Sequence, residues 1–148
     1  MINIALYQPD IPQNTAAIVR LAACLNLKVH IIEPCGFNLN DSRFKRVVMD
    51  YKKFAIITRY KSFEEFNKKH SSSRIILMTT KAKIIYHNFK FKKSDIIMFG
   101  RESAGAPVEI HDTVSNKLKI PMNKKTRSLN VAMSVAIVSS EIIRQLDI

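Results

Sequence analysis

Three short clusters contain residue types that can bind a polar ligand, and each follows or adjoins an apolar run typical of a buried strand. They span residues 12–20, 96–107 and 120–130. In the second cluster, Gly100 and Gly105 flank the acid Glu102, and glycine allows backbone to approach a ligand closely. The third leads into a long apolar helix, whose first N–H groups are free to bind anionic or polar groups. In the first, Arg20 lies among apolar neighbours, where a charge is unfavourable unless it reaches a cleft.

The elements that position these clusters alternate between strand and helix along the whole chain. Short runs rich in Ile and Val predict strands over residues 2–7, 29–32, 54–58, 74–79, 95–99 and 117–120. Helical periodicity and capping signals predict helices over residues 13–25, 42–48, 63–69 and 107–113, and one after residue 128. In this prediction, Ser62 caps the third helix, Pro107 begins the fourth and Ser128 caps the last. Near-continuous apolar strands alternating with helices predict an α/β fold, a mainly parallel sheet with helices on both faces. Ligands bind such sheets beyond the ends of the strands, where the clusters lie.

Several common chemistries are excluded by simple counts. The chain has only three glycines, so neither a G-x-G-x-x-G dinucleotide loop nor a Walker P-loop can be present. There is no G-x-S-x-G elbow, and the four histidines are scattered, which is more typical of surface or partly buried residues than of a catalytic group. The two cysteines, Cys24 and Cys35, lack metal-site spacing, so we expect no metal and a reducing compartment.

The charge balance favours a polyanionic partner. Twenty-four Lys and Arg against twelve Asp and Glu give a net charge of +12 in 148 residues. Such a surplus raises the local concentration of nucleic acid around the protein, although it can also be a solvated basic surface. No secretory signal and no apolar run of about 20 residues is visible, so we expect a soluble, cytoplasmic protein without a membrane partner.

The first turns of the final helix are apolar on every face, from Leu129 to Val138. A helix that is apolar all round has to be buried on all sides. In a chain this short, packing against a second copy achieves that most easily, which predicts a homodimer. Burial under the chain's own loops is the alternative.

Taken together and in order, the clusters resemble the three motifs of the SpoU branch of the SPOUT RNA methyltransferases. The matching segments are N-T-A-A-I-V-R at 14–20, M-F-G-R-E-S-A-G at 98–105, I-P-M at 120–122 and S-L-N-V-A at 128–132. The lead Y-Q-P-D-I-P-Q-N-T at 7–15 and the segment H-I-I-E-P at 30–34 resemble one subgroup, the tRNA (cytidine/uridine) 2′-O-methyltransferases called TrmL. The resemblance extends to about residue 145, so we expect residues 1–148 to form a single SPOUT methyltransferase domain.

The resemblance implies a C-terminal trefoil-type α/β knot, dimerisation through the knot, and methyl transfer from S-adenosylmethionine to a ribose 2′-hydroxyl of the wobble nucleotide of tRNA, leaving S-adenosylhomocysteine. It also implies two sets of site residues. The cofactor contacts carried over from the motifs are Met78, Thr79, Gly100, Glu102, Ile120, Met122 and Ser128. The functional polar positions, counted as catalytic, are Asn14, Arg20, Glu102, Ser128 and Asn130.

The basic residues that could follow RNA phosphates fall into three groups along the chain. They are Arg43, Lys45 and Arg46, then Lys81 and Lys83, then Lys124, Lys125 and Arg127. The basic stretch 90–93 either joins them or forms a solvated hairpin. The chain departs from the motifs at Arg101, where relatives often have proline, and at residues 16–17, where some have glycine; Arg101 could alter the rigidity of its loop.

The motif-one arginine, here Arg20, is the family's usual candidate for accepting the proton of the hydroxyl. A guanidinium is already protonated at neutral pH and is a poor base. We therefore expect Arg20, from the same or the partner subunit, to orient the hydroxyl and to stabilise developing charge near an RNA phosphate, with water or phosphate accepting the proton. We expect Glu102 to order the cofactor loop, and Asn14 and Asn130 to hold the loops or the ribose.

Three other functions remain open from sequence. A SPOUT enzyme could act on rRNA or at another position of tRNA. The chain could be an RNA-binding factor that has lost turnover, although the motif residues are intact. A small-molecule α/β enzyme would leave the charge of +12 without a polyanion to explain it.

Overall fold

A computed structural model describes residues 1–148, apart from the side chain of Lys52. It contains one seven-stranded sheet in the order β3-β2-β1-β6-β4-β7-β5, with every neighbouring pair parallel. The strands are β1 (Asn3–Tyr7), β2 (Lys28–Ile32), β3 (Ile56–Tyr60), β4 (Ile75–Met78), β5 (Ile84–Ile85), β6 (Ile96–Phe99) and β7 (Asn116–Lys119). The helices are α1 (Pro12–Leu25), α2 (Ser42–Lys52), α3 (Phe63–Lys69), the 3-10 turn η1 (Tyr86–Asn88), α4 (Val108–Thr113) and α5 (Val131–Leu146).

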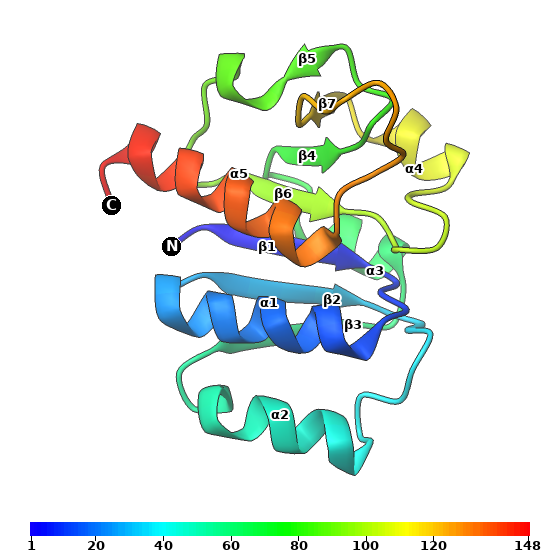
Figure 1. Ribbon diagram of the computed structural model, residues 1–148, viewed down its shortest axis with the longest axis vertical. Coiled ribbons are helices and arrows are strands. Elements are labelled where there is room, and N and C mark those ends of the chain that lie inside the picture. Colours follow the sequence, from blue (N-terminus) through cyan, green and yellow to red (C-terminus); the bar gives the residue numbers. More distant parts are fainter.

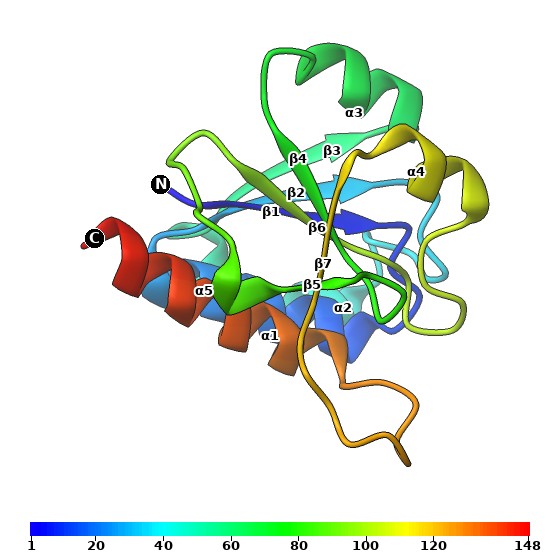
Figure 2. The same ribbon diagram turned by 90° about the horizontal axis from the view of Figure 1, so that it is seen from above.

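Helices cover both faces of this sheet, as the sequence predicts. In Figures 1 and 2, α1, α2 and α5 lie on one face and α3 and α4 on the other. One core packs the inner sides of α1 and α5 against the sheet, around buried residues such as Ile18 and Val135. A second core lies under α3 and α4, around Phe66 and Ile110. The strands are nearly continuous apolar runs because both of their faces are covered.

The predicted capping of α3 is confirmed, and two other predicted helix starts are wrong. Ser62 accepts a hydrogen bond from the Glu65 amide at 3.1 Å, as in a capping box. Pro107 is the N-cap of α4 and not its first helical residue. Ser128 does not cap α5: Asn130 does, because its side-chain oxygen accepts from the amides of the second and third helical residues.

The segment between β4 and β6 also differs from expectation. The sequence analysis predicts no element here, whereas the chain forms β5 and η1, which are too short to produce a periodic pattern. Residues 90–93 do not form a hairpin, since no strand is assigned to them. Phe91 is buried instead, and the side chain of Gln145 on α5 bonds to the backbone on both sides of Lys90.

The final helix is not covered on all sides by this chain. Its inner face is buried, but Met133 and Ile137 on the outer face are 58% and 36% exposed. Burial of this face under the chain's own loops is therefore wrong, and the homodimer stays a prediction. In the part of the chain that the structure describes, no helix has the length and hydrophobicity that crossing a membrane requires.

Candidate functional site

The three motif clusters meet because the strands before them are neighbours in a parallel sheet. β1, β6, β4 and β7 lie side by side and all point the same way, so the loops that follow them share one edge. The loop after β1 leads into α1, that after β6 into α4, and that after β7 into α5. This edge is where open parallel sheets bind ligands.

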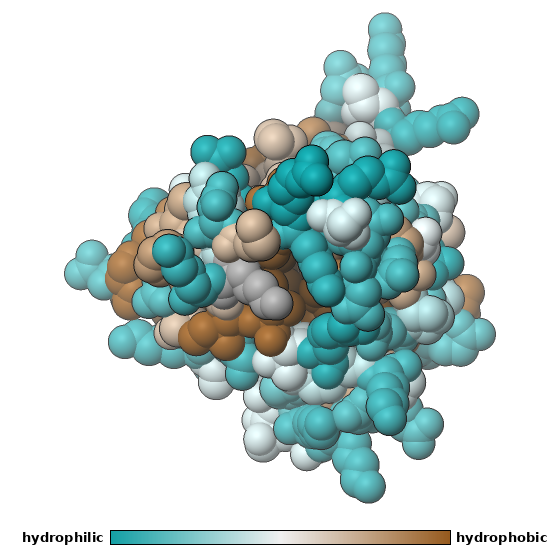
Figure 3. Space-filling view, turned by 90° about the horizontal axis from the view of Figure 1, so that it is seen from below, coloured by the Kyte–Doolittle hydropathy of each residue, from teal (hydrophilic) through white to brown (hydrophobic). Residues whose placement is uncertain are grey.

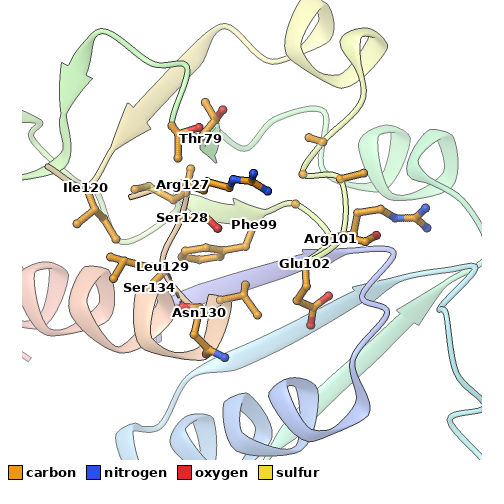
Figure 4. A pocket seen from close by; sticks show the side chains of 18 of the residues that line it. Thr79, Phe99, Arg101, Glu102, Ile120, Arg127, Ser128, Leu129, Asn130 and Ser134 are labelled. Atoms are coloured by element: carbon orange, nitrogen blue, oxygen red, sulfur yellow. Dashed lines mark hydrogen bonds between the residues drawn. The ribbon is translucent and has the colours of Figure 1, made fainter. Parts of the chain in front are cut away.

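A cavity of about 710 Å³ opens between these loops. Its apolar wall includes Met78, Phe99, Ile120, Met122 and Leu129, while Thr79, Ser128 and Asn130 contribute polar atoms. Figure 4 shows Phe99 on the floor and Arg127 extending over the cavity toward the loop after β6. The volume suits a nucleoside-sized ligand, because small-molecule sites typically measure about 300–1,000 Å³ and combine apolar walls with a few polar groups.

A chain of hydrogen bonds ties the three clusters together along one side of this cavity. Asn130, at the N-terminus of α5, donates its side-chain amide to the Asn14 side-chain oxygen at 2.8 Å. Asn14 in turn donates to Glu102 Oε1 at 3.3 Å. The other oxygen, Glu102 Oε2, accepts the Asp10 amide at 3.0 Å. These links fix α1, α5 and the loop after β6 relative to one another.

Glu102 lies beside a second carboxyl group. Burial raises the pKa of Glu102, and the neighbouring Asp10 side chain raises this pKa further. The Glu102 side chain lowers the pKa of Asp10, and hydrogen bonds from Ser103 lower it as well. Two carboxyl groups that share one site titrate in separate steps. Asp10 is therefore the more acidic member of the pair.

The loop after β6 returns so closely on itself that Gly100 cannot be replaced. A Cβ at this position would lie 2.5 Å from the backbone nitrogen of Ala106 and 2.5 Å from the carbonyl carbon of Gly105. Neither backbone atom can move aside without opening the loop. The glycine of this motif is thus required by the loop itself.

Comparison with known proteins decides the family. Residues 1–140 match the SpoU rRNA Methylase family. A tRNA (cytidine(34)-2'-O)-methyltransferase from Ancylobacter novellus is 41% identical over 144 residues, covering 96% of this chain and 91% of that protein. The chain belongs to the SpoU methylase family.

Two solved structures extend this comparison. One, described as "Structural insights into the 2-OH methylation of C/U34 on tRNA", superposes with a TM-score of 0.94 at 34% identity, covering 99% of this chain and 97% of the other. An AdoMet-bound rRNA methyltransferase from Sinorhizobium meliloti gives a TM-score of 0.87 at 21% identity, over 98% of this chain and 56% of that one. The second likeness supports the fold alone.

In this SpoU chain, the residues predicted to contact the cofactor come together. They come from the loops after β4, β6 and β7, which are far apart in sequence. All seven line the cavity: Met78, Thr79, Gly100, Glu102, Ile120, Met122 and Ser128. Their common role remains a proposal, but their positions form one site.

Of the five predicted catalytic residues, four lie at the cavity and one does not. Asn14, Glu102, Ser128 and Asn130 line it. Arg20 lies on the exposed side of α1, with its guanidinium 5.1 Å from the ring centre of Tyr51 on α2. It is therefore absent from the lining of its own chain's cavity, and the expected cleft around it is not formed within one copy.

The eight predicted RNA-binding residues fall into two places. Lys81 and Arg127 line the cavity, and Lys83, Lys124 and Lys125 are exposed on the same loops. Arg43, Lys45 and Arg46 are exposed on α2, away from the cavity and beyond α1 (Figure 1). Figure 3 shows charged side chains interspersed with exposed apolar ones on the α2 side of the molecule.

Sequence reasoning missed several residues of the site. His111 lines the cavity, and burial, together with Lys81 and Lys117, lowers its pKa. Nothing distinguished it from the other histidines in the sequence. Phe99 and Leu129 form part of the wall but look like ordinary core residues. Asp10 has no motif position of its own, and it lies just before α1, two residues ahead of Pro12.

Proposed function

We propose that this chain transfers a methyl group from S-adenosylmethionine to the ribose 2′-hydroxyl of nucleotide 34 of tRNA, a cytidine or a modified uridine. One observation carries the proposal: three sequence motifs, spread over more than 110 residues, converge on one cavity at the edge of a parallel sheet. The relative named tRNA (cytidine(34)-2'-O)-methyltransferase matches along almost the whole chain, which supports the same substrate here.

The residues of the cavity suit S-adenosylmethionine. Apolar side chains such as Ile120, Met122 and Leu129 can enclose an adenine ring, while Thr79 and the loop after β6 offer hydroxyl and backbone groups to the ribose and amino-acid parts. When bound, S-adenosylmethionine supplies an activated methyl group on a positively charged sulfur. The expectation that no metal takes part is retained in this proposal.

The chain's own contribution is alignment. The acceptor oxygen has to be held in line behind the methyl group, and such positioning supplies a large part of a rate enhancement. The Asn130–Asn14–Glu102 chain of hydrogen bonds holds the walls of the cavity rigid for this purpose. Glu102 accepts hydrogen bonds from the loop before α1 and from Asn14, so its role is to order the site.

Arg20 acts, in this proposal, in the site of a second copy. It is exposed on α1, and α5 beside it presents Met133 and Ile137 to solvent. Pairing of this surface between two copies buries the apolar face and can bring Arg20 to the other cavity. There it orients the ribose hydroxyl and stabilises charge, while water or a phosphate accepts the proton.

The remaining parts of the proposal concern organisation and location. Residues 1–148 act as a single SPOUT domain, the C-terminal segment forms the trefoil knot implied by the family, and the protein works in the cytoplasm, where its tRNA substrate lies. The exposed lysines and arginines on the loops around the cavity and on α2 contact phosphates of the RNA.

The proposal is tested by incubating the protein with methyl-labelled S-adenosylmethionine and unmodified bulk tRNA, followed by digestion to nucleosides. We expect labelled 2′-O-methylcytidine or a 2′-O-methyluridine derivative, and no label with Arg20→Ala. Label on a base would contradict the ribose mechanism. Transfer to rRNA alone would favour the rRNA alternative, and cofactor-independent RNA binding without transfer would favour the non-catalytic one.

A further inference from the structure

Asp10 holds a position that the proposed chemistry does not use. Its carboxylate accepts the backbone amide of Glu102 at 3.1 Å and the hydroxyl of Ser103. Its own backbone amide donates to Glu102 Oε2 at 3.0 Å. Three hydrogen bonds therefore join one residue before α1 to two consecutive residues of the loop after β6. These two residues line the cavity, whereas Asp10 is not among its lining residues.

The loop after β2, which contains Gly36, packs against Asp10 on the side away from the loop after β6. The Gly36 amide donates to the Pro9 carbonyl at 2.9 Å, which places the loop after β2 directly against Asp10. A Cβ on Gly36 would lie 2.5 Å from the Asp10 Cβ and 2.8 Å from its Cα. Because Gly36 has no side chain, the backbone of the loop after β2 packs directly against Asp10.

A fourth hydrogen bond reinforces the same junction. Arg101 donates from Nη2 to Gln8 Oε1 at 2.9 Å, and Figure 4 shows its side chain directed away from the cavity. Gln8 has a left-handed backbone with φ 45° and donates its own amide to Ile32. Arg101 therefore holds its loop against the end of β1 through a side-chain hydrogen bond.

We propose that Asp10 is a positioning residue that holds the Gly100–Ala106 loop in the conformation that binds the cofactor. This inference rests on the proposed function for the identity of the ligand. The loop supplies Gly100, Glu102 and the backbone around them to one wall of the cavity. Without Asp10, the amide of Glu102 and the hydroxyl of Ser103 lose their partner, and the loop has to be ordered when the ligand binds. Ordering a loop on binding lowers affinity.

The test compares the wild type with Asp10→Ala, Asp10→Glu and Asp147→Asn. Asp147→Asn is the charge-matched control, because it removes one carboxylate at the far end of α5, where asparagine also fits the left-handed backbone. Two measurements are made on each protein. Hydrogen–deuterium exchange of the ligand-free protein reports on the loop, and calorimetry with S-adenosylhomocysteine reports on binding.

With Asp10→Ala, we expect faster exchange confined to residues 100–106 and an affinity about tenfold weaker. The KM for S-adenosylmethionine rises more than kcat falls, and Asp10→Glu recovers part of both losses. The control matches the wild type. Because Asp10→Ala could fail to fold, Asp10→Asn, which keeps one acceptor oxygen and the same shape, is measured alongside and should lie between the wild type and Asp10→Ala.

Unchanged exchange in residues 100–106 together with unchanged affinity in the Asp10 variants would overturn the inference. So would faster exchange spread evenly over the whole protein, since that describes a general loss of stability. If the wild type itself does not bind S-adenosylhomocysteine, the proposed function fails. In that case the exchange data still decide whether Asp10 holds the loop.

Discussion

The hydrogen-bonded polar cluster at the cavity contrasts with another inside the fold. The first joins Glu102, Asn14 and Asn130 across three loops. The second joins His30 of β2, which is completely buried, to Tyr60 of β3 at 2.9 Å and to Asn3 of β1 at 3.1 Å. Both consist of residue types that catalyse reactions elsewhere.

The two clusters differ in whether their polar groups bond only to one another or also adjoin a cavity. Asn3 offers a carbonyl oxygen, so His30 donates from Nε2 and accepts the Tyr60 hydroxyl at Nδ1, and Tyr60 accepts from His70 at 2.9 Å. Each buried group then has a partner, as a structural network requires. The cavity cluster lies at the ends of strands and opens into a space that a ligand can fill. Location at the sheet edge, more than residue type, distinguishes the cluster that we propose to be functional.

Arg20 belongs to neither cluster, yet its replacement should lower activity most. Arg20→Ala should lower kcat/KM at least about a hundredfold, because it removes the group that we propose stabilises charge on the reacting ribose. The affinity for S-adenosylhomocysteine should stay unchanged, since Arg20 does not line its own cavity. Single-turnover methylation and calorimetry measure the two quantities. Arg144→Ala, on the exposed end of α5, is the control; equal activity of Arg20→Ala and wild type would refute the assignment.

Removing the centre of the buried cluster should affect stability and spare the site. His30→Ala removes the acceptor of the Tyr60 hydroxyl proton and the donor to the Asn3 side-chain oxygen, and it opens a cavity, so the free energy of unfolding should fall by about 3 kcal/mol. The affinity of the folded protein for S-adenosylhomocysteine should not change. Urea denaturation and calorimetry check this. A large loss of affinity with little loss of stability would mean that the two clusters are coupled.

Changing Glu102 in the cavity cluster should affect activity and spare stability. Glu102→Gln keeps the shape but loses the carboxylate that accepts from Asp10 and Asn14. We expect kcat/KM to fall by about tenfold to fiftyfold. The free energy of unfolding should stay within about 1 kcal/mol of wild type, because the group is only partly buried. Steady-state kinetics and urea denaturation should therefore show a loss of activity without a loss of stability, the reverse of His30→Ala. Full activity of Glu102→Gln would show that the reaction does not need this carboxylate.

The buried cluster should also make the stability of the fold depend on pH. Burial, with His70 and Lys28, lowers the pKa of His30 to about 4. Between about pH 6.5 and 4 the unfolded chain therefore binds a proton that the folded chain does not, and the free energy of unfolding falls as the pH falls. We expect about 2 kcal/mol of this loss to come from His30, after allowance for screening. Denaturation of wild type and His30→Phe across this range measures it, with exposed His87→Asn as control. An identical slope for His30→Phe and wild type would contradict the shift.

The smallest expected effect concerns the basic loops around the cavity. Lys124→Ala with Lys125→Ala should weaken tRNA binding and flatten the dependence of log Kd on log salt by about one to two units of slope. Lys68→Ala on α3, on the other side of the sheet, should leave the slope unchanged. Filter binding between low and moderate salt gives both values. A slope that changes only with Lys68→Ala would mean that the RNA binds on the α3 face and not around the cavity.

Much of this fold follows from sequence pattern, because parallel strands buried on both faces produce runs that periodicity detects. β6 is apolar at all four positions, and its prediction differs from the structure by one residue. β5 was missed because two isoleucines carry no pattern. The start of α5 was misplaced because Ser128 and Asn130 are equally good caps, and only the bonds that Asn130 accepts distinguish them.

The site could be predicted where a motif marks a residue and not where tertiary contacts do. Asn14, Glu102 and Ser128 stand in recognisable motifs and line the cavity. Asp10 and His111 reach the site region only through the arrangement of strands, which single-sequence spacing does not contain. Arg20 is the opposite case: its motif is recognisable, but within one chain it contacts Tyr51 and not the cavity, so its proposed role has no support from a single copy.

A crystal structure of the protein with S-adenosylhomocysteine would show directly whether the three motif clusters form one cofactor cavity. We predict the ligand between Thr79, Gly100 and Ile120, with Arg20 of a second copy facing the same cavity. Ligand bound elsewhere, or no binding at saturating concentration, would show that this cavity is not the cofactor site.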